Sequence, residues 1–373
     1  MRIGFDAKRA FSNNTGLGNY SRDAIRVLSH YFPNNKYFLY TPKNNHNPRI
    51  DFIADRENTV IRTPKSLLDR ALKVYWRSKS IVKDLCTNKI DIYHGLSNEL
   101  PLGIEKTSIK TIVTIHDLIF IRYPHLFKDI DSKIYYKKFK SACKRADKII
   151  AVSEQTKKDI IDFFFIPEEK ITVVYQGCNT IFQSKVPKHK KQPTITKYNL
   201  PKDYLLYVST IEERKNLLTL LQMLKELPEQ KLVVIGNGRS YKIKCLKFIA
   251  ENKLADRVMF FSELSLEEMA VIYQSAGIMI YPSIFEGFGI PILEALFSKI
   301  PVITSKEGCF CEAGGPHSKY IDPLSVVDMK EAIIEIQNSA ELQNNMIKKG
   351  FEYAQNFTDN KIAANLMQVY TNL

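Results

Sequence analysis

The chain has 373 residues, of which 45% are hydrophobic and 25% charged, and its formal net charge is +14. This length exceeds what one hydrophobic core usually serves, so two domains of about 150–200 residues each are expected, and the ordinary composition excludes extended disorder. No apolar run reaches the ~18 uncharged residues of a membrane-spanning helix, and the N-terminal stretch MRIGFDAKRA lacks a signal-peptide pattern. We therefore expect a cytoplasmic protein.

The positive charge lies almost wholly in the first half of the chain. Residues 1–185 hold 32 Lys+Arg against 19 Asp+Glu, whereas the remainder holds 22 against 21. This asymmetry indicates an acidic partner, which could be nucleic acid, anionic lipid or a phosphate-bearing substrate. A soluble basic surface without a partner is the alternative. The six scattered cysteines suit a reducing compartment, and Cys309 and Cys311 lack a second pair at zinc-binding spacing, so we expect free thiols and no metal site.

Short apolar runs alternate with longer amphipathic segments along the chain. Strands are predicted near residues 1–7, 36–42, 90–96, 110–117, 148–153 and 171–177, and again near 204–210, 231–238, 257–264, 277–283 and 300–305. Candidate helices lie between them, which indicates βαβ units and parallel sheets buried on both faces. The fold class predicted is α/β, with two Rossmann-like domains whose sheets face each other across a cleft.

The domain boundaries are predicted from a change in composition. Residues 185–202 are rich in Lys and Pro with little apolar periodicity, and we interpret them as a linker. They separate an N-terminal domain, 1–184, from a C-terminal domain, 203–357. Because such sheets bind ligands beyond the carboxyl ends of their strands, the loops that follow the strands are the candidate sites.

Two such loops lie in the first half. Gly16 and Gly18 precede a helix-like run, where glycines let backbone N–H groups approach an anion. The third glycine of a dinucleotide fingerprint is missing, so NAD binding has little support. His116 stands at the end of the strand predicted near residues 110–117, and its imidazole can exchange hydrogen bonds with a polar ligand. A structural hydrogen-bonding role for His116 is the alternative.

Two more loops lie in the second half. Arg214 and Lys215 stand where a helix is predicted to open, which is unfavourable unless an anion neutralises them. That anion is either a nearby glutamate, Glu212 or Glu213, or a bound diphosphate.

The stretch SIFEGFGIPILEAL places Glu286 on a Gly-Phe-Gly loop and Glu294 on the helix that follows. Two separate clamps for hydroxyl groups fit this placement better than an acid and nucleophile pair, which must flank one bond. Together, the loops indicate a site for a sugar nucleotide.

At this point the sequence resembles a known family. The motifs TGLGNY, TIHDL, AVSEQTKKDI, ERKN, YPSIFEGFGIPILEAL and EAGG occur in the order typical of retaining glycosyltransferases of the GT-B fold, family 4, and especially of the mannosyltransferase-like group. The resemblance implies a hexosyltransferase that needs no metal or other cofactor. It also implies that the last helix, 358–373, returns to the N-terminal domain.

The resemblance also assigns roles to residues. It implies that Arg214 and Lys215 neutralise the donor diphosphate, that Glu286 holds sugar hydroxyls and that Glu294 holds the ribose. The resemblance implies that backbone groups of two glycine turns complete the donor site and that His116 lines the sugar. The first turn consists of Gly16, Leu17 and Gly18, and the second consists of Gly287, Phe288 and Gly289.

The expected partners are a nucleotide sugar, GDP-mannose or a UDP-sugar, and a glycan or lipid-linked acceptor of cell-surface polysaccharide synthesis; nucleic acid is not expected. The basic stretches 70–85, which contains Trp76, and 133–148 could rest on an anionic membrane, or Trp76 could be packed inside the domain. The sequence departs from the family at Asn179 and at Ser262-Glu263, and the second departure leaves the nucleobase open between guanine and uracil. A non-catalytic basic binding protein and a sugar-nucleotide epimerase remain the alternative functions.

Overall fold

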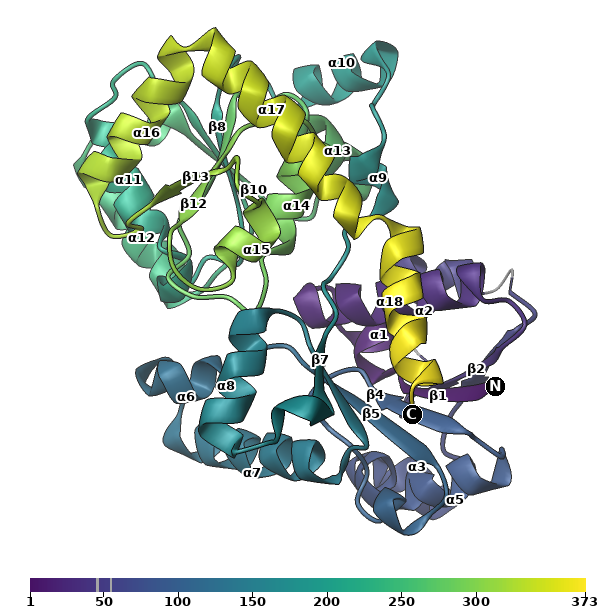
Figure 1. The fold of residues 1–373 in the computed structure, drawn as a ribbon. Coiled ribbons are helices and arrows are strands. Elements are labelled where there is room, and N and C mark those ends of the chain that lie inside the picture. The colour runs from purple at the N-terminus through teal and green to yellow at the C-terminus, as the bar shows by residue number, and fades with distance from the viewer. Residues whose placement is uncertain (45–46, 54–55) are drawn as a thin grey trace. The chain divides into compact units, whose positions relative to one another are not determined.

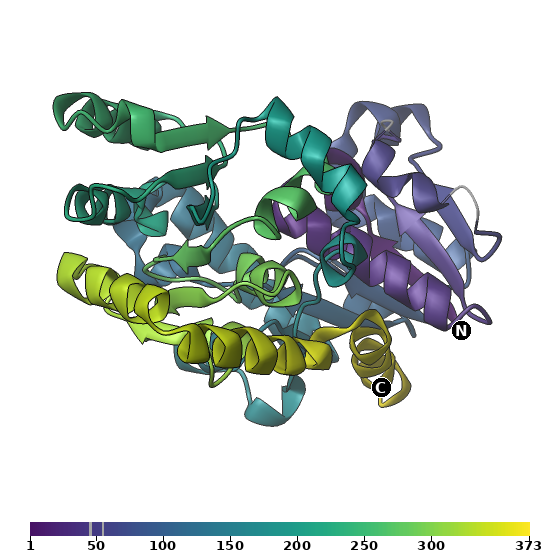
Figure 2. The same ribbon diagram turned by 90° about the horizontal axis from the view of Figure 1, so that it is seen from above.

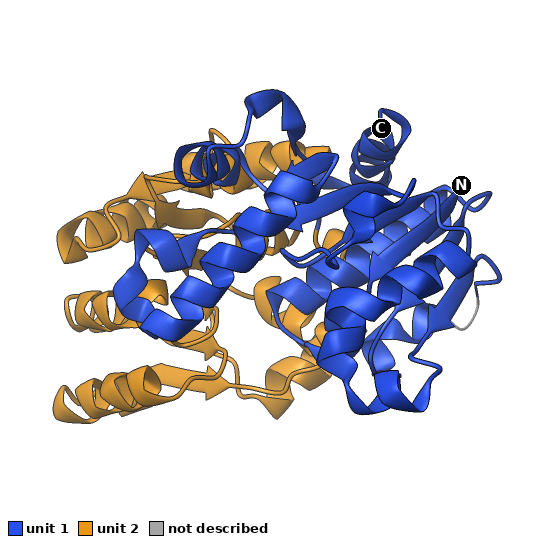
Figure 3. Ribbon diagram, turned by 90° about the horizontal axis from the view of Figure 1, so that it is seen from below, with its two compact units in different colours: residues 1–177, 357–373 blue, residues 178–356 orange. Residues whose placement is uncertain are grey.

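The computed structural model describes residues 1–44, 47–53 and 56–373. The chain divides into two compact units, coloured separately in Figure 3. The first comprises Met1–Gly177 with Phe357–Leu373, and the second comprises Cys178–Asn356. Each unit holds one parallel sheet, as the alternation of apolar runs and amphipathic segments predicts.

The first sheet has seven strands in the order β3-β2-β1-β4-β5-β6-β7. They are β1 (Arg2–Asp6), β2 (Lys36–Tyr40), β3 (Thr59–Arg62), β4 (Ile92–Gly95), β5 (Lys110–Ile115), β6 (Lys148–Ala151) and β7 (Ile171–Val173). Strands β1, β4 and β5 are almost entirely buried, which explains their continuous apolar sequence. Strand β3 was not predicted, because TVIR at the edge of the sheet is short and only partly buried.

Helices cover the first sheet. They are α1 (Lys8–Ser12), α2 (Gly16–Tyr31), α3 (Leu67–Ala71), α4 (Lys73–Tyr75), the π-helical turn η2 (Trp76–Ser80), α5 (Ile81–Thr87), α6 (Ile119–Arg122), α7 (Asp129–Arg145), α8 (Glu154–Phe164) and, from the end of the chain, α18 (Asp359–Thr371). Short 3-10 turns are η1 (Pro48–Ile53), η3 (Ile104–Lys106), η4 (Pro124–Leu126) and η5 (Glu168–Lys170). Helix α18 packs beside α2 in this unit (Figure 1).

The second sheet has six strands in the order β10-β9-β8-β11-β12-β13. They are β8 (Leu205–Val208), β9 (Leu232–Ile235), β10 (Val258–Phe261), β11 (Ile278–Tyr281), β12 (Val302–Ser305) and β13 (Lys319–Ile321). Strand β13, three residues at the sheet edge, was not predicted. In both sheets the strand order reverses once, between β1 and β4 and between β8 and β11, and such a switch point is where doubly wound sheets bind ligands.

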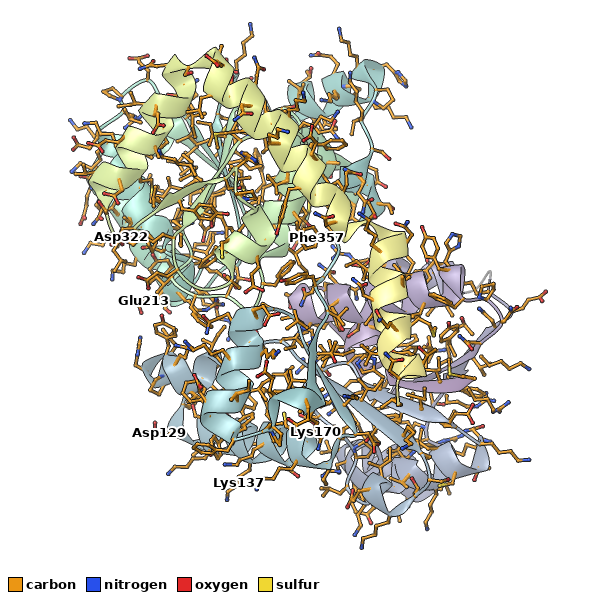
Figure 4. The ribbon with its side chains drawn as sticks, in the orientation of Figure 1. Asp129, Lys137, Lys170, Glu213, Asp322 and Phe357 are labelled. Carbon is orange, nitrogen blue, oxygen red and sulfur yellow. The ribbon has the colours of Figure 1, made fainter. Side chains whose placement is uncertain are left out.

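The helices of the second unit are α9 (Thr180–Gln183), α10 (Lys188–Lys197), α11 (Leu217–Lys225), α12 (Ser240–Glu251), α13 (Leu266–Tyr273), α14 (Ile290–Phe297), α15 (Phe310–Gly314), α16 (Val326–Asn338) and α17 (Ala340–Ala354). Three 3-10 turns, η6 (Glu213–Lys215), η7 (Ala255–Arg257) and η8 (Gln355–Phe357), complete the elements. Figure 2 shows α17 running toward the turn that leads into α18. At that turn the chain re-enters the first unit with Phe357, labelled in Figure 4, which is buried and packs its ring on Tyr175 of the same unit at 5.6 Å between centroids.

The segment interpreted as a linker, 185–202, differs from that prediction. Most of it forms α10, which packs against α13, and the whole segment belongs to the second unit. The side chains of Lys197 and Tyr198 both bond Glu268 Oε1, at 2.6 and 2.7 Å, which ties the end of this helix to α13. Composition alone could not reveal this, since α10 buries no residue and shows no apolar periodicity. The chain changes unit at residues 177–178 and again at 356–357.

Candidate functional site

The second unit gathers charged side chains at the switch point of its sheet. Turn η6, with Arg214 and Lys215, follows β8, and the loop that carries Glu286 follows β11, the strand that pairs with β8. A backbone bond from Ile284 N to Arg214 O, 2.8 Å long, joins the two loops. Neighbouring parallel strands therefore deliver these residues to the same edge of the sheet, although 71 positions separate Lys215 from Glu286 in the sequence.

Glu286 is the centre of this cluster. The residue is 8% exposed, and its Oε1 accepts hydrogen bonds from Ser283 Oγ at 2.6 Å and Tyr281 OH at 3.1 Å. Lys215 Nζ also bonds Oε1, while Arg214 Nη1 lies 3.0 Å from Oε2. Both carboxylate oxygens are thus held by donors, and the side chain is fixed before any ligand arrives.

The neighbouring charges oppose the effect of burial on the pKa of Glu286 and on that of Lys215. Burial alone would raise the pKa of Glu286, but Lys215 and Arg214 lower it to about 2, so the carboxylate is ionised at neutral pH. Burial lowers the pKa of Lys215 from its usual value, and Glu286 partly offsets that effect. Glu212, the other carboxylate bonded to Arg214, at 2.6 Å, has a half-exposed side chain. The buried part of the site therefore presents two cations around one carboxylate.

The placement of Arg214 and Lys215 differs from the prediction in one respect. They do not open a helix, because they lie in η6 and α11 begins only at Leu217. Between them Asn216 has a left-handed backbone conformation, with φ of 57°, which separates η6 from α11. Their neutralising carboxylates are Glu286 and Glu212; no ion pair of Glu213 with either cation is found among the described residues.

The Gly-Phe-Gly turn that follows Glu286 is held by its own backbone geometry and by a cysteine. Gly289, just before α14, has φ of 120°, which residues with a side chain rarely adopt. The thiol of Cys309 donates to Glu286 O at 3.2 Å and to Phe288 O at 3.0 Å. Helix α14 begins at Ile290, directly after the loop, as predicted, and Pro291 lies in its first turn.

Glu294, on α14, is separated from this cluster by the first turn of the helix. Its Oε2 accepts a hydrogen bond of 2.6 Å from Tyr273 OH, at the end of α13. Tyr273 is fully buried, and the ring of Phe182 packs against it. Sequence reasoning missed Tyr273, because nothing near it in the chain signals a partner 21 residues away. Ser283, in contrast, lies inside the quoted motif and its hydroxyl could have been noticed.

In the first unit the glycine turn opens α2, as predicted. Gly18 has no room for a side chain, because a Cβ there would lie 1.8 Å from Asn13 O, whereas a Cβ on Gly16 would meet nothing within 4 Å. Gly16, Leu17 and Gly18 form the first turn of α2, and of their backbone N–H groups that of Gly18 donates to Thr15 O at 3.0 Å. This turn follows β1, at the switch point of the first sheet.

His116 stands just after β5, as predicted, but it is deeply buried, at 6% exposure. Its Nε2 donates to Leu96 O at 2.8 Å, which leaves Nδ1 as the acceptor, 3.4 Å from the Gln176 amide. The ring packs edge-on against Tyr20 of α2, with 4.6 Å between centroids. Burial lowers the pKa of His116 to about 4, so the imidazole is neutral at physiological pH.

A buried chain of hydrogen bonds extends from Tyr20 to the C-terminal helix. Tyr20 OH lies 3.0 Å from Thr114 Oγ1, which lies 2.7 Å from His94 Nε2, and His94 Nδ1 lies 2.6 Å from Tyr370 OH of α18. Tyr20, which packs against His116, is thereby linked through hydrogen bonds to the last helix, α18. No sequence pattern indicated these hydrogen bonds.

Among the described residues, no group of three or more His, Cys, Asp or Glu side chains is arranged to hold a metal ion. The six cysteines are free thiols, and burial raises the pKa of Cys309 well above its usual value. Across the described part of the chain, no helix combines the length and apolar character that crossing a membrane requires.

Solved structures with the same fold are glycosyltransferases of the GT-B type. A glycosyltransferase from Rickettsia africae ESF-5 superposes with a TM-score of 0.77 at 18% identity, covering 100% of this chain and 98% of that one. Anabaena Alr3699/HepE in complex with UDP-glucose gives a TM-score of 0.77 at 14% identity, covering both chains fully. At these identities the likeness establishes the fold class alone.

Sequence comparison identifies the family. The family model described as Glycosyltransferase Family 4 matches residues 22–182, and the one described as Glycosyl transferases group 1 matches residues 188–353. O-antigen chain mannosyltransferase B of Escherichia coli is 26% identical over 72% of this chain and 70% of its own length. O-antigen chain mannosyltransferase RfbU of Salmonella typhimurium is 29% identical over 60% of each chain. The chain belongs to this glycosyltransferase family.

Proposed function

We propose that the protein is a retaining glycosyltransferase that moves a hexose from a nucleoside-diphosphate sugar to a glycan or lipid-linked acceptor in cell-surface polysaccharide synthesis. The observation that carries the proposal is the meeting of Arg214, Lys215 and Glu286 at the switch point between β8 and β11. Two buried cations beside one carboxylate suit a ligand that has both phosphate charge and hydroxyl groups.

Each part of the donor has a candidate partner in the second unit. Glu286 would accept hydrogen bonds from sugar hydroxyls, exchanging bonds that it now receives from Ser283 and Tyr281. The turn Gly287, Phe288 and Gly289 would offer backbone N–H groups to the sugar and phosphate. Glu294, held by Tyr273, would accept the two ribose hydroxyls. In the first unit, the turn that begins α2 would add N–H groups to the diphosphate.

Arg214 and Lys215 would act on the step in which the glycosidic bond breaks. As the bond from the anomeric carbon to the phosphate oxygen lengthens, negative charge grows on the diphosphate, and two fixed cations stabilise that charge without a metal. The leaving phosphate oxygen would take the acceptor hydroxyl proton on the same face of the sugar, so the configuration is retained. His116, neutral and bonded through Nε2, would line the sugar rather than exchange a proton.

The donor is proposed to be GDP-mannose or a UDP-sugar. Relatives named as mannosyltransferases support the first, and the UDP-glucose complex of a structural neighbour supports the second. Thermal unfolding measured with each nucleotide sugar in turn tests the choice, because a ligand that binds only the folded state raises Tm. If neither GDP-mannose nor any UDP-sugar raises Tm, the assignment is contradicted.

Transfer itself requires a second measurement. NMR of the product linkage should show the anomeric configuration of the donor, and turnover in EDTA should equal turnover in added Mg²⁺. An inverted product would contradict the proposed chemistry. Turnover of donor without acceptor, giving an epimer, would favour an epimerase.

We include peripheral association with an anionic membrane in the proposed function. The first unit holds 32 Lys+Arg against 20 Asp+Glu, a surplus of twelve positive charges. Such a surplus attracts anionic lipid surfaces at physiological ionic strength.

A further inference from the structure

The loop that follows β11, residues 282–289, is bonded to the segment 304–309, which leads from β12 into α15. Ser305 Oγ donates to Ser283 O at 2.5 Å. The Cys309 thiol lies within hydrogen-bond distance of two further carbonyl oxygens of the loop. Ser305 and Cys309 are each 1% exposed, so water has little access to replace these contacts. One buried segment therefore supplies side-chain donors to three carbonyl oxygens of the loop that carries the carboxylate of the site.

The contact of Ser305 shows how such a donor orients the loop. In a trans peptide group the C=O and N–H bonds point in opposite directions, and no cis peptide bond is found among the described residues. Ser305 holds the carbonyl of Ser283, and on the opposite side of the same peptide group Ile284 N donates to Arg214 O at 2.8 Å. A donor on one side of the loop thereby fixes an N–H group on the other side, where it meets the turn that carries both cations of the site.

Cys309 stands in the same relation to the Gly-Phe-Gly turn. Its thiol lies 3.2 Å from Glu286 O and 3.0 Å from Phe288 O. The N–H groups of the same two peptide groups belong to Gly287 and Gly289, so these N–H groups point away from the thiol. Both belong to the turn that is proposed above to contact the sugar and phosphate of the donor. The thiol therefore sets the direction of two groups of the proposed donor site.

The thiol of Cys309 keeps its proton at neutral pH. Burial raises the pKa of Cys309 well above its usual value, and the nearby charge of Glu286 adds to the rise. A thiolate would also be repelled by the carbonyl oxygens that it faces. Because nucleophilic attack and metal binding both require the thiolate, hydrogen-bond donation is the chemistry left to this side chain.

The donor segment is itself fixed within the second unit. Ser305 ends β12, a fully buried strand that pairs with β11. In α15, Glu312 O accepts a hydrogen bond of 2.8 Å from Tyr353 OH of α17. Phe310 is fully buried, and its ring packs on Tyr281, which donates to the carboxylate of the site, with 6.3 Å between centroids. The two donors are thus carried by packed elements, which suits a supporting role for a site of precise geometry.

We propose that Ser305 and Cys309 are positioning residues for glycosyl transfer, which hold the peptide groups of the loop so that its N–H groups and the Glu286 carboxylate keep the geometry of the transition state. Both act through the loop and not by contact with the donor. The inference rests on the proposed function, because that function assigns these N–H groups to the donor. Groups that are oriented in advance stabilise charge as it develops, so kcat should depend on them more than KM does.

Three variants and a control separate positioning from packing. Cys309→Ala removes the thiol donor, so kcat should fall about tenfold while the donor KM changes by less than about threefold. Cys309→Ser supplies a hydroxyl donor of similar size and should recover most of the lost kcat. Ser305→Ala should lower kcat about tenfold as well. The control, Cys245→Ala, removes a fully buried thiol from α12 of the same unit, and its kinetics should equal those of the wild type.

The serine variant decides between donation and packing. A buried cysteine can also act as a small apolar side chain, and in that role serine would serve no better than alanine. Equal losses of kcat in Cys309→Ala and Cys309→Ser would therefore overturn the proposal, as would a Cys309→Ala enzyme that turns over like the wild type. Thermal unfolding of every variant separates a loss of kcat from a loss of the fold.

An infrared measurement tests the thiol contact without activity. The S–H stretching band of Cys309 is isolated by subtracting the spectrum of Cys309→Ala from that of the wild type. The band should lie at lower frequency than that of a simple thiol in an apolar solvent, because donation weakens the S–H bond. A band at the frequency of an unbonded thiol would overturn the proposal. A wild type that binds no nucleotide sugar would instead contradict the proposed function, and the infrared band would still decide whether Cys309 holds the loop.

Discussion

Replacing Lys215 by methionine tests the proposed catalytic step directly. The Lys215 side chain is 11% exposed, and its Nζ bonds Glu286 and, at 3.2 Å, Tyr281 OH. Methionine keeps most of the buried apolar stem but removes the charge. Glu286 would retain the Arg214 contact at 3.0 Å and the Ser283 hydrogen bond at 2.6 Å, so the carboxylate is not left without donors.

The expected magnitude follows from when the charge acts. A fixed cation aimed at charge that develops in the transition state contributes about 3 kcal/mol, which corresponds to a loss of roughly 10²-fold in kcat. The donor carries its diphosphate charge already in the ground state, so KM should rise, but by a smaller factor. Steady-state kinetics with varied donor, at saturating acceptor, separates the two parameters.

A matched variant isolates the position of the charge. Lys225→Met on α11 removes an exposed lysine from the same unit, and its kinetics should equal those of the wild type. Thermal unfolding of both variants shows whether the fold persists. A Lys215→Met enzyme with unchanged kcat and a raised KM would refute the assignment, because Lys215 would then contribute uniform binding of the donor and nothing specific to the transition state.

Three further predictions follow from single contacts. Tyr273→Phe removes a 2.6 Å hydrogen bond to the Glu294 carboxylate, so the donor KM should rise about tenfold with kcat unchanged, and a change in kcat alone would contradict the ribose role. Gly289→Ala forces a side chain into φ of 120° and should cost about 2 kcal/mol in urea unfolding; a cost near zero would show that the turn relaxes. The pKa of His116 is about 4 in the folded protein against 6.5 in the unfolded chain, so its contribution to folding stability is fully present above pH 6.5 and is lost as the pH falls toward 4, by about 3 kcal/mol. The free energy of unfolding of His116→Asn should therefore depend less on pH than that of the wild type in this window, and equal pH slopes would refute the lowered pKa. The pKa of Asp23 is shifted in the opposite direction, to about 6, but it is shifted in both proteins, so its contribution cancels in the comparison.

Much of the fold follows from local sequence because burial on both faces of a parallel sheet imposes a continuous apolar run. Eleven strands were predicted this way, among them the edge strands β7 and β10, whereas the edge strands β3 and β13, which are short and only partly buried, escaped. Helix α10 escaped for a related reason: it buries no residue, so its lysines carry no helical periodicity. Composition therefore indicated a linker where polar contacts with α13 hold a helix.

The sequence alone determined the motif residues of the candidate site and the order of the loops that carry them. It placed Glu286 on a turn, Glu294 on a helix and the Arg214-Lys215 pair after a strand, because glycine, proline and apolar periodicity act over a few residues. Only the tertiary structure decided which side chains meet. Glu286 and Lys215 are 71 residues apart in the chain, and they meet because β8 and β11 are neighbours at the switch point. Likewise, only packing decided that Trp76 is buried while the leucines before it are exposed: the indole N–H must find a partner, and Asp84 supplies one inside the unit.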